Sequence, residues 1–310
     1  MKILFVSGHE HMPQAQGGVQ SNTIIPALFG GNPNVGEEES DTRTFGVVLT
    51  PLALPKLAVA LDYFDITLDG AIAQLGGGLN NTLNLCYNVI QDIDSEFCQA
   101  INRNPVTGEI SVPYYAEIRQ ANTGGLETSG YDLSARYGFD FGFGLFGNGS
   151  TLNVSTAWTK TNEFTSTPVQ AFPNVKNRCV GSYGTTCGEP IPEYNGATRF
   201  TCITGPLSLS LRHRFIDDVT VDRYLLPTRA GTTAPAYGDL VNPRLDSQNY
   251  LDFSFSYEWG QQVEFSGGVN NLADDDPPVV GSAQIRANTW PATYDYNGRT
   301  MFIGMTVRTL

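Results

Sequence analysis

Acidic side chains crowd two short stretches of the chain, where they could hold a divalent cation. The stretch NNLADDDPPVV (270–280) contains Asp274, Asp275 and Asp276, and the stretch GEEESD covers 36–41. A calcium loop of the EF-hand type needs alternating acidic ligands, a central glycine and a distal glutamate, and neither stretch has that spacing. We therefore interpret both as solvated loop faces, with adventitious binding of a divalent cation left open for the three aspartates.

The histidines give no support for catalysis. His9 and His11 lie near the start of the chain, and His213 falls within an alternating apolar stretch. A nucleophilic triad needs a histidine beside its serine or cysteine, and no such grouping is visible. The three glycines at 76–78 lack the Lys-Ser/Thr that closes a phosphate-binding loop. The sequence therefore predicts a protein that is not an enzyme, with no catalytic residue, cofactor or metal site. Metal binding by His9 and His11 stays open as an alternative.

Four of the five cysteines form two close pairs in loop-like sequence. Neither spacing is C-x-x-C and the histidines are distant, so a zinc site is poorly supported. We predict two local disulfides, Cys86 with Cys98 and Cys179 with Cys187, and these imply an oxidising compartment. Cys202 is left over and is expected to be unpaired.

Charge and hydropathy exclude several classes of protein. The chain has 310 residues and a net charge of −13 at pH 7, which would repel a phosphate backbone, so we expect no nucleic-acid partner. No apolar run reaches the about 18 residues of a membrane helix. The apolar stretch at the N-terminus is shorter than the about 7–15 residues that a signal peptide needs. We expect either a cytoplasmic protein or a longer protein whose N-terminal part is missing.

Apolar and polar residues alternate along much of the chain. In YLDFSFSYEWG, for example, Leu251, Phe253 and Phe255 share one face and Asp252 and Ser254 share the other. Alternation with a period of two predicts β-strands. We place them at 42–50, 56–68, 125–139, 150–162, 199–215, 219–228, 248–259, 262–272 and 297–309. A short helix is expected within NTLNLCYNVIQDIDSEFCQAI (81–101).

The connections between these strands alternate in length. The short ones are expected near 51–55, 140–149, 216–218 and 259–261, and the long ones at 69–124, 163–198, 229–247 and 273–296. A soluble β-sandwich would bury the apolar face against a second sheet. A transmembrane barrel would turn that face to lipid and keep a polar lumen. Strand length, the alternation of short turns with long loops, and aromatics at strand ends favour the barrel.

Five stretches resemble the barrel of TonB-dependent outer-membrane receptors, in the order that the family has them. They are GNPNVGEEESDTRTFGVVLTP (31–51), LAVALDYFDITLDGAI (57–72), GGLETSGYDLSARY (124–137), GGVNNLADDDPPVV (267–280) and YDYNGRTMFIGMTVRTL (294–310). The motif of the penultimate strand is carried here by Asn270, Asn271, Leu272, Asp274, Pro277 and Pro278, and that of the last strand by Gly298 and Arg299.

The resemblance implies the fold. We expect an all-β chain that is an antiparallel transmembrane β-barrel segment, with about 9–10 strands of a barrel of about 22 strands. Long outward loops and one short loop helix would complete it. Residues 1–30 are an unplaced N-terminal segment, with one further strand expected in the first eight residues. Residues 31–310 form the C-terminal part of the barrel, and the plug domain has no counterpart.

The resemblance also assigns architectural roles to the motif residues. Asn270, Asn271 and Leu272 would end the penultimate strand. Asp274 would cap the following turn through its side chain, and Pro277 and Pro278 would stop the strand ladder. Gly298 and Arg299 would begin the last strand. One departure is Thr309, which stands where the family has an aromatic residue.

The function implied is that of a transporter in the bacterial outer membrane. Such a protein takes up ferric siderophores, cobalamin or oligosaccharides, and this chain would supply barrel wall and ligand-binding loops. The partners implied are outer-membrane lipid, the transported ligand, the barrel-assembly machinery, and the TonB complex only through the plug segment. A soluble β-sandwich that binds glycans is the alternative, and a secreted β-rich hydrolase is a third, weaker hypothesis.

Overall fold

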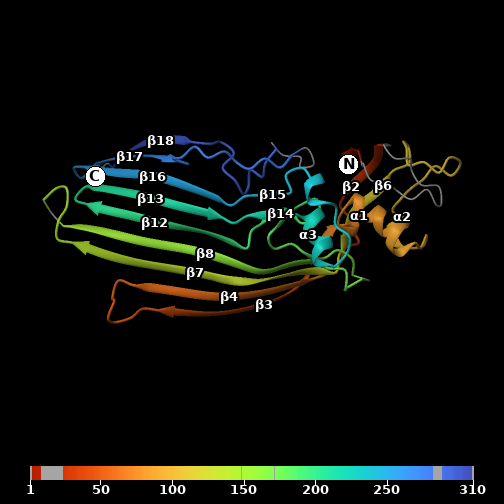
Figure 1. Ribbon diagram of the computed structural model, residues 1–310, viewed down its shortest axis with the longest axis horizontal. Helices are drawn as coiled ribbons and strands as arrows, with labels where there is room; N and C mark the ends of the chain where they lie inside the picture. The colour runs from red at the N-terminus through yellow and green to blue at the C-terminus, as the bar shows by residue number, and fades with distance from the viewer. Residues whose placement is uncertain (1, 8–23, 148, 171, 282–287, 309–310) are drawn as a thin grey trace. The chain divides into compact units, whose positions relative to one another are not determined.

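A long antiparallel sheet contains most of the strands (Figure 1). The computed structural model describes residues 2–7, 24–147, 149–170, 172–281 and 288–308. In order across the sheet, the strands are β3 (Glu39–Leu49), β4 (Ala58–Asp69), β7 (Gly125–Phe141), β8 (Ser150–Thr167), β12 (Tyr194–Thr204), β13 (Leu207–Ile216), β16 (Gln248–Trp259), β17 (Val263–Asn270) and β18 (Thr300–Val307). A tenth strand, β9 (Asn177–Arg178), pairs with β8. The prediction of an antiparallel barrel segment of this size is confirmed.

Contacts divide the chain into two compact units, which are described separately. The first comprises Met1–Asp41, Thr67–Glu127 and Ser166–Asn177. The second comprises Thr42–Ile66, Thr128–Thr165 and Arg178–Leu310. His9 and His11 lie outside the described residues, as does Thr309.

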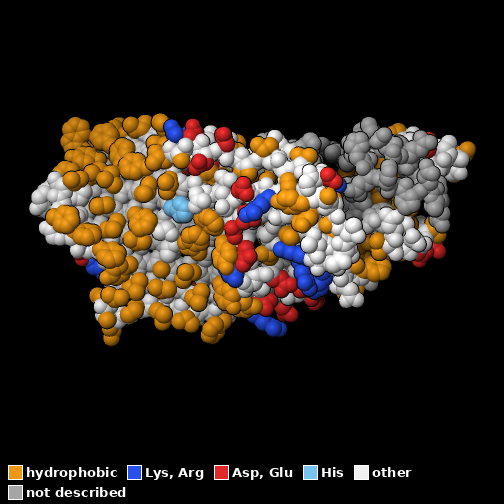
Figure 2. All heavy atoms as spheres, viewed as in Figure 1, with side chains coloured by type: hydrophobic (Ala, Val, Ile, Leu, Met, Phe, Trp, Pro, Cys, Tyr) orange, Lys and Arg blue, Asp and Glu red, His pale blue; other side chains and the backbone are white. Residues whose placement is uncertain are grey.

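The two faces of the sheet differ in chemistry because successive side chains in a strand point to opposite sides. The register of β13 on β16 places Leu209 opposite Phe255 on one side and Arg212 opposite Asp252 on the other. We call these sides the apolar face and the polar face. Figure 2 shows hydrophobic side chains gathered over this sheet. The alternation in the sequence has therefore produced a sheet with one apolar and one polar side.

The connections between neighbouring strands of the sheet alternate strictly in length. The short ones lie at one end of the sheet in Figure 1 and are residues 50–57, 142–149, 205–206 and 260–262. The long ones are residues 70–124, 168–193, 217–247 and 271–299. This is the asymmetry expected from the sequence, although one of the short turns is not where it was expected.

The predicted strand 199–215 is wrong, because these residues belong to two strands. β12 and β13 form a hairpin around the turn Gly205-Pro206. Gly205 has φ +55°, which suits the first central position of a tight hairpin turn, and the fixed φ of proline suits the second. The sequence signal for this turn is Thr204-Gly205-Pro206, which interrupts the alternation of apolar and polar residues. Residues 216–218 were expected as a short turn, but Ile216 ends β13 and residues 217–218 begin a long connection.

The predicted strand 219–228 is also wrong after its first residues. Val219–Val221 form the short strand β14, and Asp222–Arg229 form the helix α3. An acidic residue in the first turn and a basic residue in the last turn complement the helix dipole, and α3 has both. A short apolar run fits a strand or a helix equally well, so periodicity alone did not separate them.

The long connections of the second unit pack into a small structure that we call the loop module. Its sheet has the order β11 (Gly188–Ile191), β10 (Ser182–Gly184), β14 and β15 (Arg244–Leu245), and α3 and the short helix η3 (Tyr237–Asp239) complete it. Its core contains Tyr183, Ile216, Val219, Val221, Leu245, Tyr250, Val280 and Tyr294. Cys179 and Cys187 are joined by a disulfide with sulfurs 2.05 Å apart. These outward loops are therefore packed together around one hydrophobic core.

The first unit has its own sheet and core. The sheet has the order β1 (Lys2–Ser7), β2 (Ile24–Gly30), β6 (Ala116–Asn122) and β5 (Ile72–Gln74). Segment 1–30 therefore contains β1, within the first eight residues, and β2, which was not expected. The helical segments are η1 (Leu75–Gly77), α1 (Leu79–Asn84), η2 (Leu85–Ile90) and α2 (Glu96–Gln99).

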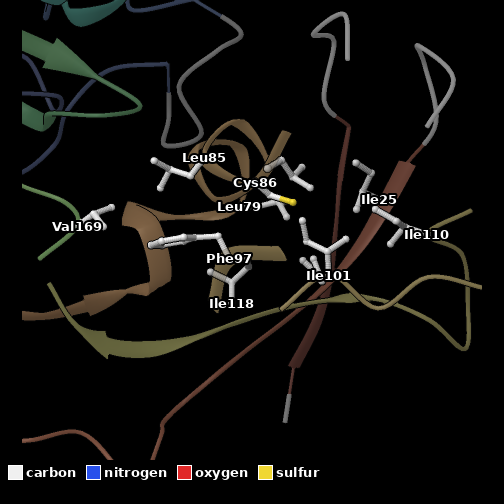
Figure 3. Packing of buried hydrophobic residues seen from close by; sticks show 12 residues of the cluster. Ile25, Leu79, Leu85, Cys86, Phe97, Ile101, Ile110, Ile118 and Val169 are labelled. Carbon is white, nitrogen blue, oxygen red and sulfur yellow. The ribbon is translucent and has the colours of Figure 1, made fainter. Parts of the chain in front are cut away.

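Apolar side chains from the helical segments and from the strands meet in this core. Figure 3 shows Leu79 and Phe97 directed toward the same space as Ile118 and Ile25.

Cys86 and Cys98 are joined by a disulfide with sulfurs 2.00 Å apart, so both predicted cysteine pairs stand at bonding distance. The single helix expected in 81–101 is a series of short segments, and α3 is a further helix. Within the described residues, no helix is both long and apolar enough to cross a membrane.

Helix α3 is fastened to the disulfide-closed segment of the loop module at both of its ends. At the start, the buried Asp222 carboxylate accepts hydrogen bonds from the backbone N–H groups of Thr186 (2.6 Å) and Cys187 (3.0 Å). At the end, Arg229 donates a hydrogen bond of 2.7 Å to the carbonyl oxygen of Val180. Burial raises the pKa of Asp222, although the backbone donors oppose the rise. The stability of this attachment therefore depends on the protonation of one carboxyl group.

We expect the amides of Thr186 and Cys187 to become better protected from hydrogen exchange as the pH falls. The pKa of Asp222 is raised above its ordinary value of 3.8, so the folded module binds this proton more readily than the unfolded chain. Stability is therefore gained as the pH falls through the raised pKa and lost as the pH rises through it. The measurement is exchange at these two amides, corrected for the intrinsic rate, from about pH 7 to about pH 4.

The variant Asp222→Asn keeps an acceptor oxygen but cannot ionise, so this pH dependence should disappear. Asp246→Asn is the matched control, because the Asp246 side chain belongs to the same module and is 88% exposed. The assignment of this pH dependence to Asp222 would be contradicted if exchange at the two amides still depended on pH in Asp222→Asn. It would also be contradicted if Asp246→Asn removed the dependence.

Candidate functional site

Arg214 is the centre of a charged cluster on the polar face. Its guanidinium donates two hydrogen bonds to Asp252, from Nε at 2.8 Å and from Nη2 at 3.0 Å. It also donates to Asp295, from Nη1 at 3.2 Å and from Nη2. The same group stacks over the ring of Tyr250, with Cζ 4.8 Å from the ring centroid. Both donor edges of the guanidinium are thus engaged, and two carboxylates share one positive charge.

The strands bring these groups together through their register. Arg214 lies opposite Tyr250, and Arg212 lies opposite Asp252, two residues further along β13 and β16 and on the same face. Asp295 comes from the connection between β17 and β18 and reaches the same guanidinium. The cluster therefore ties two adjacent strands to a segment that returns from a long loop.

The motif residue Asn271 connects to this cluster. Its backbone N–H donates to Asp252 Oδ1 at 3.0 Å. Its side chain is buried and holds the backbone of Asp275 on both sides, accepting from the N–H at 3.0 Å and donating to the carbonyl oxygen at 2.9 Å. Asn271 has φ +51°, a left-handed conformation that asparagine tolerates. The structure therefore places the local turn-capping role on Asn271.

Asp274 makes a longer connection than the sequence predicted. Its Oδ1 accepts a hydrogen bond of 2.8 Å from the backbone N–H of Arg299, so it joins the end of β17 to the start of β18. Gly298 has φ +65°, and a Cβ there would lie 3.1 Å from this oxygen. The expectation that Asp274 caps its own turn is corrected in this respect.

The other motif residues have smaller roles. Asn270 Nδ2 donates to Thr300 Oγ1 at 3.3 Å, and the backbone N–H of Leu272 donates to the carbonyl oxygen of Leu251 at 2.6 Å. Pro277 and Pro278 are half-buried after the end of β17, and the carbonyl oxygen of Pro278 accepts from Thr289. Among the described residues, no three His, Cys, Asp or Glu side chains gather to hold a metal ion.

His213 and Cys202 lie on the apolar face and away from the cluster. The register places His213 opposite Leu251 and Cys202 opposite Leu209. His213 Nε2 stands 2.9 Å from Asn249 Oδ1, and Cys202 is a free cysteine. Neither side chain has a nucleophile, base or metal ligand grouped with it in the part of the chain that the structure describes.

Arg212 lies on the polar face, two residues before Arg214. No hydrogen bond or ion pair joins it to any described residue, and its charge acts only at longer range on Asp252. It lines a cavity of about 340 Å³ with Arg214, Asp252, Asn270, Tyr294 and Thr300. It also lines a second cavity of about 470 Å³ with Asp62, Asp132, Ser134, Thr159 and Asn195.

Both cavities have polar walls in which two guanidiniums, of Arg212 and Arg214, face two carboxylates, those of Asp252 and Asp295 in the first cavity and of Asp62 and Asp132 in the second. The remaining wall groups are hydroxyl and amide groups, and the Arg212 guanidinium has no hydrogen-bond or ion-pair partner among the described residues. Tyr294 lines the first cavity, but its hydroxyl is buried in the core of the loop module, where burial raises its pKa. No motif in the sequence marks Arg212, Arg214, Asp252 or Asp295 as functional residues. The available signal was two arginines on the polar side of a predicted strand, next to a strand with an aspartate on that side.

Comparisons with known proteins found a matching family model and several similar structures. A family model described as TonB dependent receptor-like, beta-barrel matches residues 7–272. No curated protein matches the sequence. A double mutant of the ferric enterobactin receptor PfeA from Pseudomonas aeruginosa is similar in structure, with a TM-score of 0.56 and 16% identity over 98% of this chain and 35% of that chain.

Two further solved structures show the same similarity of fold. The siderophore receptor PirA from Acinetobacter baumannii has a TM-score of 0.52 and 16% identity over 92% of this chain and 34% of that chain. The FrpB iron transporter from Neisseria meningitidis has a TM-score of 0.50 and 13% identity over 91% of this chain and 33% of that chain. This chain spans about a third of the length of the structures that it resembles.

We expect Arg214→Ala to destabilise the folded chain by about 2 kcal/mol or more, because it leaves Asp252 and Asp295 facing each other without a cation. Both side chains are less than a third exposed, at 12% and 31%, so solvent screens their repulsion only in part. The measurement is thermal or denaturant unfolding in detergent, followed by circular dichroism.

Arg308→Ala is the matched control for this change. The Arg308 side chain pairs with Glu264 in the same sheet but is 63% exposed, so its removal should cost less than about 1 kcal/mol. The double variant Arg214→Ala/Asp252→Ala should be less destabilised than the two single changes added together. An equal loss in the free energy of unfolding for Arg214→Ala and Arg308→Ala would show that the Arg214 cluster stabilises the chain no more than an exposed ion pair does.

Proposed function

The chain belongs to the TonB-dependent receptor-like β-barrel family, and we propose that it supplies barrel wall and outward loops to an outer-membrane transporter of ferric siderophores. Barrels of this family reside in the bacterial outer membrane. The family consists of receptors, and no bond-breaking step is assigned to this chain. The alternative of a soluble, glycan-binding β-sandwich finds no support in a long sheet of this family.

The observation that carries the proposal is the polar face around Arg212 within a sheet of this family. Ferric siderophores are anionic or strongly polar chelates, and a guanidinium that is not paired with any described residue is suited to receive them. The similar structures named above include receptors for ferric enterobactin and for a siderophore, which supports this class of ligand over cobalamin or an oligosaccharide.

Other parts of the proposal follow from the family. Transport would be driven by the TonB complex acting on a plug domain, which is not among the described residues. The barrel-assembly machinery would insert the strands into the membrane. In this scheme the loop module faces the medium and Arg212 lies on the route that the ligand takes along the polar face.

The test is ligand binding to the chain folded in detergent, with ferric enterobactin as the probe and tryptophan fluorescence as the signal. Cyanocobalamin and a linear maltooligosaccharide are the competing ligand classes. We expect saturable quenching by the ferric chelate and none by the other two. Arg212→Gln should raise the dissociation constant about tenfold, because it removes one charge-assisted contact worth about 1.5 kcal/mol.

Arg199→Gln is the matched control for binding. Arg199 lies on the same polar face, opposite Arg212, but its Nη1 already donates to Ser210 Oγ at 3.0 Å. Its replacement should leave the dissociation constant nearly unchanged. Preferential binding of cyanocobalamin or the oligosaccharide, or no binding of any probe by a chain with a normal β-sheet spectrum, would overturn the proposed ligand class.

A further inference from the structure

The turn between β7 and β8 is apolar, although it is a short connection that would usually face water. Residues 141–149 read FGFGLFGNG and contain no charged side chain. Phe143 is 74% exposed, Leu145 is 73% exposed and Phe146 is 46% exposed. Large apolar groups gathered on one exposed turn generally mark a surface that is covered by something else.

The side of the sheet on which this turn begins follows from β7. Hydrogen bonds join Asp132 to Thr159 and Asp140 to Thr151, so the even-numbered residues of β7 lie on the polar face. Phe141 therefore lies on the apolar face. The ring of Phe143 lies 5.6 Å from that of Phe141, so the start of the turn continues the apolar row of the strand.

The rest of the turn is fixed against the same face. The backbone N–H of Leu145 donates to Thr204 Oγ1 at 2.9 Å. The ring of Phe146 lies 6.5 Å from that of Tyr257, which register places beside Leu207 on the apolar side. Phe146 also packs over Gly205, where a Cβ would lie 3.2 Å from its atoms. The turn therefore leans across the β12–β13 hairpin toward β16, on the apolar side.

The base of the turn is closed by a further hydrogen bond, from Ser150 Oγ to the carbonyl oxygen of Phe143 at 2.6 Å. Trp259, at the end of β16, belongs to the same rim and lies 5.9 Å from Phe265, ring to ring. Tryptophan and tyrosine next to a band of aliphatic residues are typical of the boundary between lipid headgroups and acyl chains.

We propose that the turn at Phe143–Phe146 is embedded in the lipid boundary of the membrane leaflet at the short-turn end of the sheet. The occupant is lipid because the turn is continuous with the apolar face, which membership of this family turns to lipid, and because it carries no charge. The inference uses the membrane location of the family and does not depend on which ligand is transported. The lipid-contacting surface therefore extends past the ends of β7 and β8.

The test places a nitrobenzoxadiazole label at residue 145, by Leu145→Cys in a Cys202→Ser background, and inserts the chain into phosphatidylcholine vesicles. We expect a blue shift of emission on insertion, strong quenching by phosphatidylcholine spin-labelled near the headgroup, and little quenching by aqueous iodide. Val106→Cys in the same background is the matched control, because Val106 is equally apolar and 90% exposed but lies in a long connection. Its label should be quenched by iodide and not by the lipid.

A second variant separates insertion from folding. Phe143→Ser/Leu145→Ser should keep the β-sheet spectrum in detergent but should insert into vesicles more slowly and to a smaller extent than the unchanged chain. Iodide quenching at residue 145 as strong as at residue 106 would overturn the proposal. So would protection at residue 145 that appears without lipid and grows with protein concentration, since a second copy of the chain would then cover the turn.

Discussion

The guanidinium of Arg214, held between Asp252 and Asp295, is the interaction on which the polar side of this structure depends. It joins β13 to β16 and ties both to the connection that leads into β18. Asp252 also accepts from the backbone of Asn271, so the end of β17 is fixed to the same centre. Two carboxylates at partly buried positions repel each other unless a cation lies between them. The position of the connection that leads into the last strand, β18, therefore depends on this ion cluster.

The strict alternation of side chains is what allows one sheet to serve two environments. On one side it gathers Leu209, Leu211, Phe253 and Phe255, and on the other it gathers arginine, aspartate and hydroxyl groups. Among the described residues, neither side is covered by a second sheet, as a soluble sandwich requires. A lipid phase on the apolar side and an aqueous lumen on the polar side satisfy both requirements, which agrees with the family to which the chain belongs.

The sequence was a good guide to the long sheet, where a strand could be recognised from its own residues. It failed where the outcome depends on short signals or on distant partners. The turn Gly205-Pro206 was hidden inside an alternating run, and α3 was hidden in an apolar stretch that suits two structures. The Arg214 cluster could not be predicted, because it requires the register of two strands and the path of a third segment. The motif around Asn271 was recognised by resemblance, yet its hydrogen bonds to Asp252 and Asp275 appear only in three dimensions.

The direction of the two edge strands, β3 and β18, limits how the long sheet can close into a barrel. The described path from β3 to β18 contains nine strands in which neighbours run antiparallel, so β3 and β18 point the same way. Pairing these edges directly, or with the edges of a second copy inserted in the same orientation, would create a parallel contact. Outer-membrane barrels of single chains are antiparallel and even in strand number. An antiparallel closure of this wall therefore requires an odd number of further strands between its edges, and the row of lipid-facing side chains on β18 would continue onto the first of them.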